Sequence, residues 1–342
     1  MELEFCHFLS QQFPGDKSYS LKSTEFSNLL EPKYNFAVNC QSGIPLITST
    51  SRGSDCDNTF VDSRENKLRV EADDIAGLSE AKSAIFESVV YPLQYPHLFN
   101  CRLAMPPRGV LLYGPPGTGK TMLAKWVASC CDSTFYSVSA ASIMSKWIGE
   151  SEKSVKAIFE TARLNQPSVI FIDEIDCILG KRSEADHEAT RRLKNEFLVS
   201  LDGVDTDFRD HIVVIGATNI PWELDEAALR RFSRRIYIPL PSDEGRKQLI
   251  HRELSVYARE SKTQFNELSN AEWVEIITRT TGYSGSDIKC VLQEAVLISV
   301  REVINGAIHS ARSIRIEDLR SALNTVGVKC ETDRSNPYES WL

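Results

Sequence analysis

The sequence predicts an α/β fold, in which a parallel five-stranded sheet lies between helices and a small all-helical domain follows. Five short runs are apolar along their whole length, as is typical of parallel strands covered on both faces. Segments with helical periodicity separate these runs, and no strand pattern recurs after Ser242. The expected strands span residues 109–113, 134–138, 169–174, 212–219 and 235–239.

Pattern and composition divide the chain into four segments. Residues 1–70 are polar and acidic, which predicts a flexible arm; the alternative is a docking segment that orders on a partner. Residues 71–241 carry the α/β pattern, 242–328 the helical domain and 329–342 a C-terminal tail or helix. The expected helices span residues 79–90 (stopped by Pro92), 122–128, 152–164, 244–259, 271–281, 284–305 and 316–326.

Composition narrows the possible functions. The net charge of −8 argues against general nucleic-acid binding, which needs a basic face. The N-terminus lacks the basic and apolar regions of a secretory signal, and no window has the length and apolarity of a membrane span. The nine cysteines show no zinc-ligand spacing, so we expect reduced thiols in a cytosolic or nuclear protein.

A glycine-rich segment follows the first expected strand and opens a helix. Gly114-Pro115-Pro116-Gly117-Thr118-Gly119-Lys120-Thr121 has the spacing of a phosphate-binding loop. Its backbone N–H groups can surround a polyphosphate at the positive end of the helix dipole. Lys120 would reach the β and γ phosphates, and the Thr121 hydroxyl would bind Mg²⁺. The alternative is a chance Gly/Pro-rich turn.

Acidic and amide side chains end the next apolar strands. Asp173 would hold Mg²⁺ through its water shell, and Glu174 would polarise the water that attacks the γ-phosphate. The alternative is that this pair caps the strand and forms salt bridges. Asn219 would donate a hydrogen bond to the γ-phosphate or to the attacking water; a plain turn role remains open.

Eight motifs follow one another along residues 70–342. In chain order they are IAGL, YGPPGTGKT, SKWIGESEK, VIFIDEID, HEATRRLKNEFLVSLDGV, GATNIPWELDEAALRRF, RRIYIPLP and GYSGSDIK. This ordered set resembles the motifs of the AAA ATPases, specifically the meiotic clade of severing and vacuolar-sorting enzymes. The resemblance implies an AAA module with a helical lid, and a homohexameric ring that binds ATP and Mg²⁺.

The resemblance also assigns residues outside the phosphate loop. Arg230 and Arg231 match arginine fingers that enter the neighbouring subunit's site; the alternative is a surface salt-bridge cluster with Asp225 and Glu226. The nucleotide-binding set also includes Ile75, Ala76, Gly77, Met122, Gly285 and Ser286.

Two segments match the pore loops of the family. The first contains Lys146, Trp147 and Ile148, whose aromatic ring would insert between side chains of a threaded polypeptide; a core position for Trp147 is the alternative. The second, from Lys181 to Arg192, supplies the basic residues Arg182, Arg191 and Arg192.

Within the clade, the motifs are most similar to those of katanin catalytic subunits and katanin-like proteins. The short connection 306–313 disfavours the vacuolar-sorting branch, while spastin and fidgetin relatives remain open. The resemblance implies microtubule severing in the cytoplasm, at the spindle or centrosome, by pulling acidic tubulin tails through the pore. The acidic chain suggests a separate targeting subunit. Other clients, such as membrane-scission filaments, or a slowly hydrolysing adaptor remain alternatives.

Overall fold

The computed structural model describes residues 70–99, 105–131, 133–140, 143, 150–181, 188–205, 211–263, 267–305, 312–326, 337–338 and 341. All of them belong to the unit Asp57–Leu342. The predicted arm lies outside the described residues, apart from Val70.

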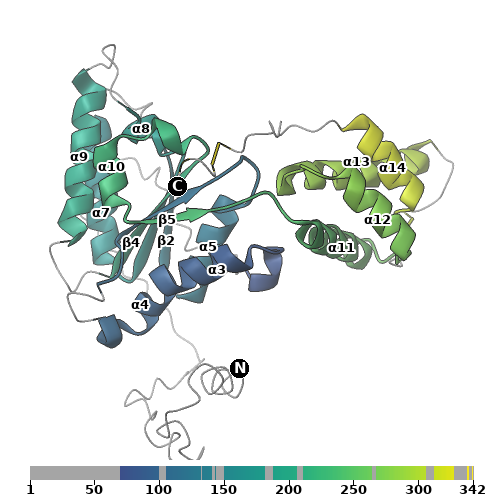
Figure 1. Ribbon diagram of the computed structural model, residues 1–342, viewed down its shortest axis with the longest axis horizontal. Coiled ribbons are helices and arrows are strands. Elements are labelled where there is room, and N and C mark those ends of the chain that lie inside the picture. The colour runs from purple at the N-terminus through teal and green to yellow at the C-terminus, as the bar shows by residue number, and fades with distance from the viewer. Residues whose placement is uncertain are drawn as a thin grey trace, which may run out of the picture. The chain divides into compact units, whose positions relative to one another are not determined.

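Five parallel strands form one sheet, as the sequence predicts (Figure 1). Their order in the sheet is β2-β3-β4-β1-β5. Because each strand is apolar along its length, both faces of the sheet can be buried. The strands are β1 Gly109–Tyr113, β2 Thr134–Ser139, β3 Ser168–Asp173, β4 Ile212–Thr218 and β5 Arg234–Tyr237.

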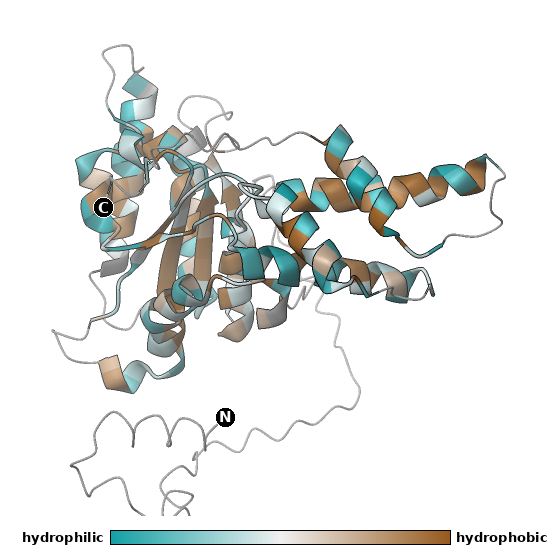
Figure 2. Ribbon diagram, turned by 45° about the vertical axis from the view of Figure 1, so that its right-hand side comes forward, coloured by the Kyte–Doolittle hydropathy of each residue, from teal (hydrophilic) through white to brown (hydrophobic). Residues whose placement is uncertain are grey.

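Helices cover both faces of this sheet. Successive side chains of a strand point to opposite faces, so Val169 and Phe171 belong to one core cluster while Ile170 and Ile172 belong to the other. The hydrophobic strands lie in the interior of this layered arrangement (Figure 2). Helices on the Val169 face are α3 Ser79–Ile85, η3 Phe86–Val90 and α5 Lys120–Cys130; those on the other face are α7 Glu150–Leu164, α8 Asp176–Leu179, α9 Glu188–Asp205 and α10 Glu226–Arg231.

The helical run that begins at Ser79 does not stop at Pro92, contrary to the prediction. Residues Phe86–Val90 form a π-helical turn, and α4 (Tyr91–Gln94) continues directly from it. Proline is tolerated in the first turn of a helix, where its missing N–H costs little, and Pro92 occupies such a position in α4. Short 3₁₀ turns occupy Ala72–Asp74 (η2), Pro96–Phe99 (η4) and Pro221–Glu223 (η5).

Four helices after β5 build the lid around a core of their own. Ser242, Ser269 and Ser284 each accept a hydrogen bond from a first-turn N–H, which explains where three of the helices begin. The helices are α11 Asp243–Glu260, α12 Asn270–Arg279, α13 Gly285–Ile304 and α14 Ile316–Thr325. Within the described residues, no helix is long and apolar enough to cross a membrane.

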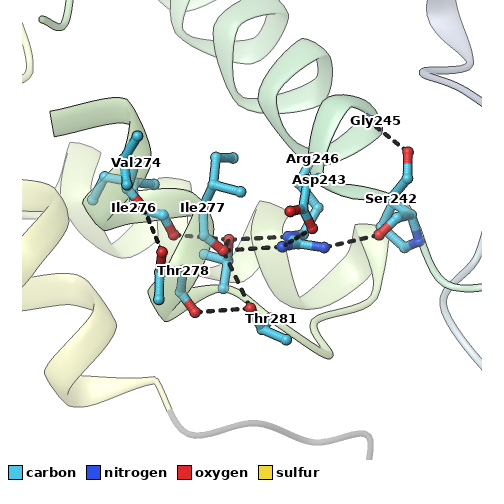
Figure 3. Close-up of polar contacts among 11 residues, drawn as sticks. Ser242, Asp243, Gly245, Arg246, Val274, Ile276, Ile277, Thr278 and Thr281 are labelled. Carbon is cyan, nitrogen blue, oxygen red and sulfur yellow. Dashed lines mark hydrogen bonds and ion pairs between the residues drawn. The ribbon is translucent and has the colours of Figure 1, made fainter. Parts of the chain in front are cut away.

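A buried arginine ties the start of α11 to the end of α12 (Figure 3). The Arg246 guanidinium is 4% exposed and donates to the carbonyl oxygens of Pro241 and Ile277 and to the Thr280 hydroxyl. It also pairs with Asp243 at 2.9 Å. The connection between β5 and the lid is therefore held by one satisfied cation.

Candidate nucleotide site

A cavity of about 420 Å³ lies where the carboxyl ends of β1, β3 and β4 meet the lid. Ligands of open α/β sheets bind at this edge of the strands. Most of the nucleotide residues expected from the sequence line it, while Gly77, Gly114 and Pro115 lie beside it in the chain without lining it. The predicted residues that line the cavity are Ile75, Ala76, 116–122, Asp173, Glu174, Asn219, Gly285 and Ser286.

The phosphate loop has a positive φ at three glycines, Gly114, Gly117 and Gly119, a backbone conformation that residues with side chains rarely adopt. Gly117 has φ +74°, and an added Cβ would lie 2.6 Å from the Ser284 hydroxyl of the lid. Gly114 has φ +148° and is packed against the Ile238 carbonyl. The loop is thereby fitted between the sheet and the lid.

Lys120 is buried with its ammonium group inside the loop. Its Nζ donates to the carbonyl oxygens of Gly114 and Pro115 at 2.9 and 2.8 Å. The Thr118 hydroxyl donates to the same Pro115 carbonyl. This places a positive charge on the loop that the sequence assigns to phosphate binding.

Two oxygen donors for a metal ion meet at the cavity. The Thr121 hydroxyl, in the first turn of α5, lies 3.3 Å from Oδ2 of Asp173 at the end of β3. Hydroxyl and carboxylate oxygens are hard ligands that suit Mg²⁺. These two donors of the chain therefore fit the Mg²⁺ ion expected from the sequence.

Glu174 follows with a positive φ of 52°, which is uncommon for a residue with a side chain. Its N–H donates to Asp173 Oδ1 at 3.0 Å, and its side chain lines the cavity. Among the described residues neither carboxylate forms a salt bridge, so the strand-capping alternative lacks its expected ion pairs. Strained backbone that persists at such a position points to function.

Asn219 has an unsatisfied side-chain oxygen. Its Oδ1 is buried and accepts no hydrogen bond from the described residues, although buried amides are normally paired. The turn after β4 is instead made by Thr218, whose hydroxyl accepts the Ile220 N–H and donates to Asp176. The turn role therefore falls to Thr218, and the Asn219 carboxamide remains for a ligand in the cavity that it lines.

The lid contributes further contacts to the site. The Ser286 N–H donates to the Gly117 carbonyl, joining α13 to the phosphate loop. Lys289 and Glu253 also line the cavity and lie 3.7 Å apart. Lys289 is the last residue of the motif GYSGSDIK, whereas Glu253 is an ordinary charged position in a helical pattern, so only the packing of the lid reveals Glu253.

Arg230 and Arg231 do not reach this cavity. They line a separate groove of about 830 Å³ together with Arg108, Asp202 and Arg234. Arg231 binds Asp202 through two hydrogen bonds of 2.9 and 2.8 Å, whereas exposed Arg230 pairs with Glu226 at 3.8 Å. The alternative of a surface salt-bridge cluster is therefore met in part by the pair of Arg230 and Glu226, while Asp225 pairs with Lys194 at 2.7 Å.

One part of the pore-loop prediction is wrong in its local structure. Arg191 and Arg192 lie on α9 and not on a loop, because the apolar positions of Glu188–Asp205 repeat with helical spacing and pack on the sheet. Both are exposed, and Arg192 pairs with Glu188 one turn earlier. Lys146, Trp147, Ile148 and Arg182 lie outside the described residues.

Two family models match the chain. Residues 110–240 match the ATPase family associated with various cellular activities (AAA), and residues 270–313 match the AAA+ lid domain. Both ranges fall on the elements that surround the cavity.

Curated relatives match over most of this chain. Spastin of Naegleria gruberi is 47% identical over 276 residues, 79% of this chain and 51% of the relative. Fidgetin-like protein 1 of Caenorhabditis elegans is 44% identical over 272 residues, 78% of this chain and 44% of the relative. Vacuolar protein sorting-associated protein 4B of Mus musculus, from the branch disfavoured above, is 50% identical over 68% of this chain and 51% of the relative. The chain thus matches about half the length of these relatives.

A solved structure matches as well. The crystal structure of the FIGL-1 AAA domain in complex with ADP has a TM-score of 0.69 and 43% identity, covering 78% of this chain and 88% of that one.

Proposed function

Because this chain belongs to the AAA ATPase family, we propose that it hydrolyses ATP in a ring of six copies and uses the cycle to pull on a polypeptide. The observation that carries the proposal is the single cavity in which Lys120, Asp173, Glu174 and Asn219 come together under the lid. Each group has the chemistry that phosphoryl transfer needs.

Each residue of the cavity has a separate role in the proposed hydrolysis. Lys120 binds the β and γ phosphates, and Thr121 and Asp173 would hold Mg²⁺, which neutralises charge on the phosphate oxygens when bound. Glu174 orients and polarises a water for attack on the γ-phosphorus. The bond to the bridging oxygen then breaks and releases ADP and inorganic phosphate. Asn219 orients the water or the γ-phosphate.

The arginine fingers belong to the same proposal. They lie away from their own chain's cavity, which is the arrangement expected of groups that act on a neighbour. Exposed Arg230 has only a long ion pair on the surface of α10, and such pairs contribute little. Arg231 is oriented by Asp202, so Arg230 is the residue more easily released toward phosphate.

From the motif resemblance we further propose that the polypeptide pulled is the acidic tail of tubulin, and that the activity is microtubule severing of the katanin type. An acidic tubulin tail would be attracted by Lys146, Arg191 and Arg192 at the pore, and salt would weaken that attraction. A net charge of −8 opposes approach to an acidic polymer, which favours a separate targeting subunit. The motif resemblance is the basis for proposing a cytoplasmic, cytoskeleton-associated location. Another client, such as a membrane-scission filament, and a slowly hydrolysing adaptor are the competing candidates.

Phosphate release by wild type and Glu174→Gln, each with and without microtubules, tests these proposals. We expect robust hydrolysis by wild type, stimulation by microtubules, and loss of hydrolysis with retained ATP binding in the variant. Glu260→Gln, at the exposed end of α11, is the matched control. Equal rates for wild type and Glu174→Gln would reject the enzyme, whereas robust hydrolysis with intact filaments under the microscope would reject only the microtubule client.

A further inference from the structure

A tyrosine near the C-terminus contacts the residue that follows β4. The Tyr338 hydroxyl donates a 2.8 Å hydrogen bond to the main-chain carbonyl oxygen of Asn219, 119 residues earlier in the chain. Tyr338 is 9% exposed and lies beyond both family-model ranges, which end at residue 313. No sequence motif suggested a contact between this part of the chain and the cavity.

The ring of Tyr338 is held in place by other aromatic residues. It stacks on Tyr237 at the end of β5, with ring centroids 5.9 Å apart, and contacts Trp222 of η5 at 5.4 Å. Trp341, three residues later, packs edge-on against Tyr113 at 4.8 Å, and the Arg235 guanidinium lies over its ring. Aromatic pairs of this geometry add stability beyond the area they bury, so the hydroxyl is presented to Asn219 in a defined position.

The hydrogen bond acts on a residue whose side chain faces a ligand site. Asn219 lines the nucleotide cavity, and its Oδ1 is buried without a partner among the described residues. The preceding residue is already fixed, because Thr218 bonds to Asp176 and to the Ile220 N–H. Tyr338 supplies the remaining restraint, on the peptide group that joins Asn219 to Ile220.

We propose that Tyr338 is a positioning residue for ATP hydrolysis, whose hydroxyl fixes the backbone of Asn219 and so aims the Asn219 carboxamide at the γ-phosphate or the attacking water. The inference rests on the proposed ATPase activity and adds a C-terminal residue to the machinery of that site. Small misplacements of an orienting group are costly in catalysis, because the reacting atoms must be aligned. Binding of ATP depends mainly on the phosphate loop, so the effect falls on turnover.

Tyr338→Phe keeps the aromatic ring and removes only the hydroxyl. We expect kcat about three- to tenfold lower, the range that loss of one net hydrogen bond represents, with KM for ATP changed less than about twofold. The kcat is taken from the plateau of specific activity against protein concentration, so that weaker ring assembly does not imitate slower chemistry. Tyr95→Phe removes a tyrosine hydroxyl at an exposed position outside the cavity lining, and it should retain the wild-type kcat.

Hydrogen–deuterium exchange provides a readout that does not depend on activity. The peptide containing Asn219 and Ile220 should take up deuterium faster in Tyr338→Phe than in wild type or Tyr95→Phe. A Tyr338→Phe protein with wild-type kcat, or with unchanged exchange at this peptide, would overturn the positioning role while leaving the ATPase proposal intact. A wild-type protein that hydrolyses no ATP would overturn both.

Discussion

The Thr121 hydroxyl lies 3.3 Å from the Asp173 carboxylate, although 52 residues separate them in the chain. The two groups meet because β1 and β3 are parallel, so the helix that follows β1 begins at the edge where β3 ends. Together they offer two hard oxygen ligands, which suit the Mg²⁺ ion proposed for this site.

Thr121→Ala removes one of the two oxygen ligands and should therefore raise the Mg²⁺ concentration that hydrolysis needs. We expect the Mg²⁺ concentration for half-maximal hydrolysis to rise about tenfold or more, while Thr121→Ser, which keeps the hydroxyl, stays near wild type. Phosphate release measured across a Mg²⁺ titration checks this. Identical titrations for Ala and wild type would remove Thr121 from the metal site.

Lys120→Ala should lose nucleotide affinity. The ammonium group is buried and bound to two loop carbonyls, so its removal takes away both a positive charge and the order of the loop. We expect ATP to bind about tenfold more weakly or worse, as measured by calorimetry. Lys125→Ala, farther along α5 and outside the cavity lining, serves as control and should bind ATP like wild type.

Arg246→Met should destabilise the lid. The substitution keeps an apolar stem but removes the donor to the Pro241 carbonyl and one of the donors to the Ile277 carbonyl, which keeps the Thr280 hydroxyl, at a cost of about 2 kcal/mol. Thermal unfolding should therefore begin at a lower temperature than in Arg259→Met, an exposed position on the same helix. Equal unfolding temperatures for the two variants would contradict a structural role for this network.

Ionisation of Asp318 should make the free energy of unfolding of the lid depend on pH in the acid range. Burial opposes ionisation of this carboxyl, but hydrogen bonds from the Arg312 guanidinium and the Arg315 N–H outweigh it and hold its pKa below the ordinary 3.8. A lowered folded-state pKa contributes stability that is present above the ordinary value and is lost as the pH falls through the folded one. Unfolding measured between pH 6 and about 2.5 should show this loss.

Asp318→Asn should remove most of that acid dependence, whereas Glu317→Gln at the exposed neighbouring position should keep it. The asparagine variant should also be less stable than wild type at neutral pH, since Arg312 then loses a charged partner. An unchanged pH profile in Asp318→Asn would show that other carboxylates control the transition.

Trp147→Ala should separate nucleotide chemistry from work on the client. The pore-loop assignment predicts normal ATP binding by this variant and no severing of filaments under the microscope, since the ring is assigned to the polypeptide and not to the nucleotide. Severing at the wild-type rate would withdraw the assignment of Trp147 to the pore.

Local pattern predicted much of this molecule correctly. The strands that end at Tyr113, Asp173 and Thr218 were visible because buried parallel strands are apolar throughout, and each carries its functional residue at or just after its end. The same reasoning failed at Pro92, where a π-turn carries the helix past the expected stop. It also failed at Arg191 and Arg192, since the apolar face of α9 outweighed the interpretation of that segment as a loop.

The amino-acid sequence alone determined the chemistry of the site: a phosphate loop, two carboxylates and an amide at the ends of strands, because these depend on residue type and on spacing along the chain. Only the tertiary structure decided which distant groups support them. Glu253 reaches the cavity from lid helix α11, and Tyr338 bonds a carbonyl 119 residues away. Every residue carries a main-chain carbonyl oxygen, so the residue type at position 219 does not show that this oxygen accepts a hydrogen bond. Only the three-dimensional packing reveals that contact.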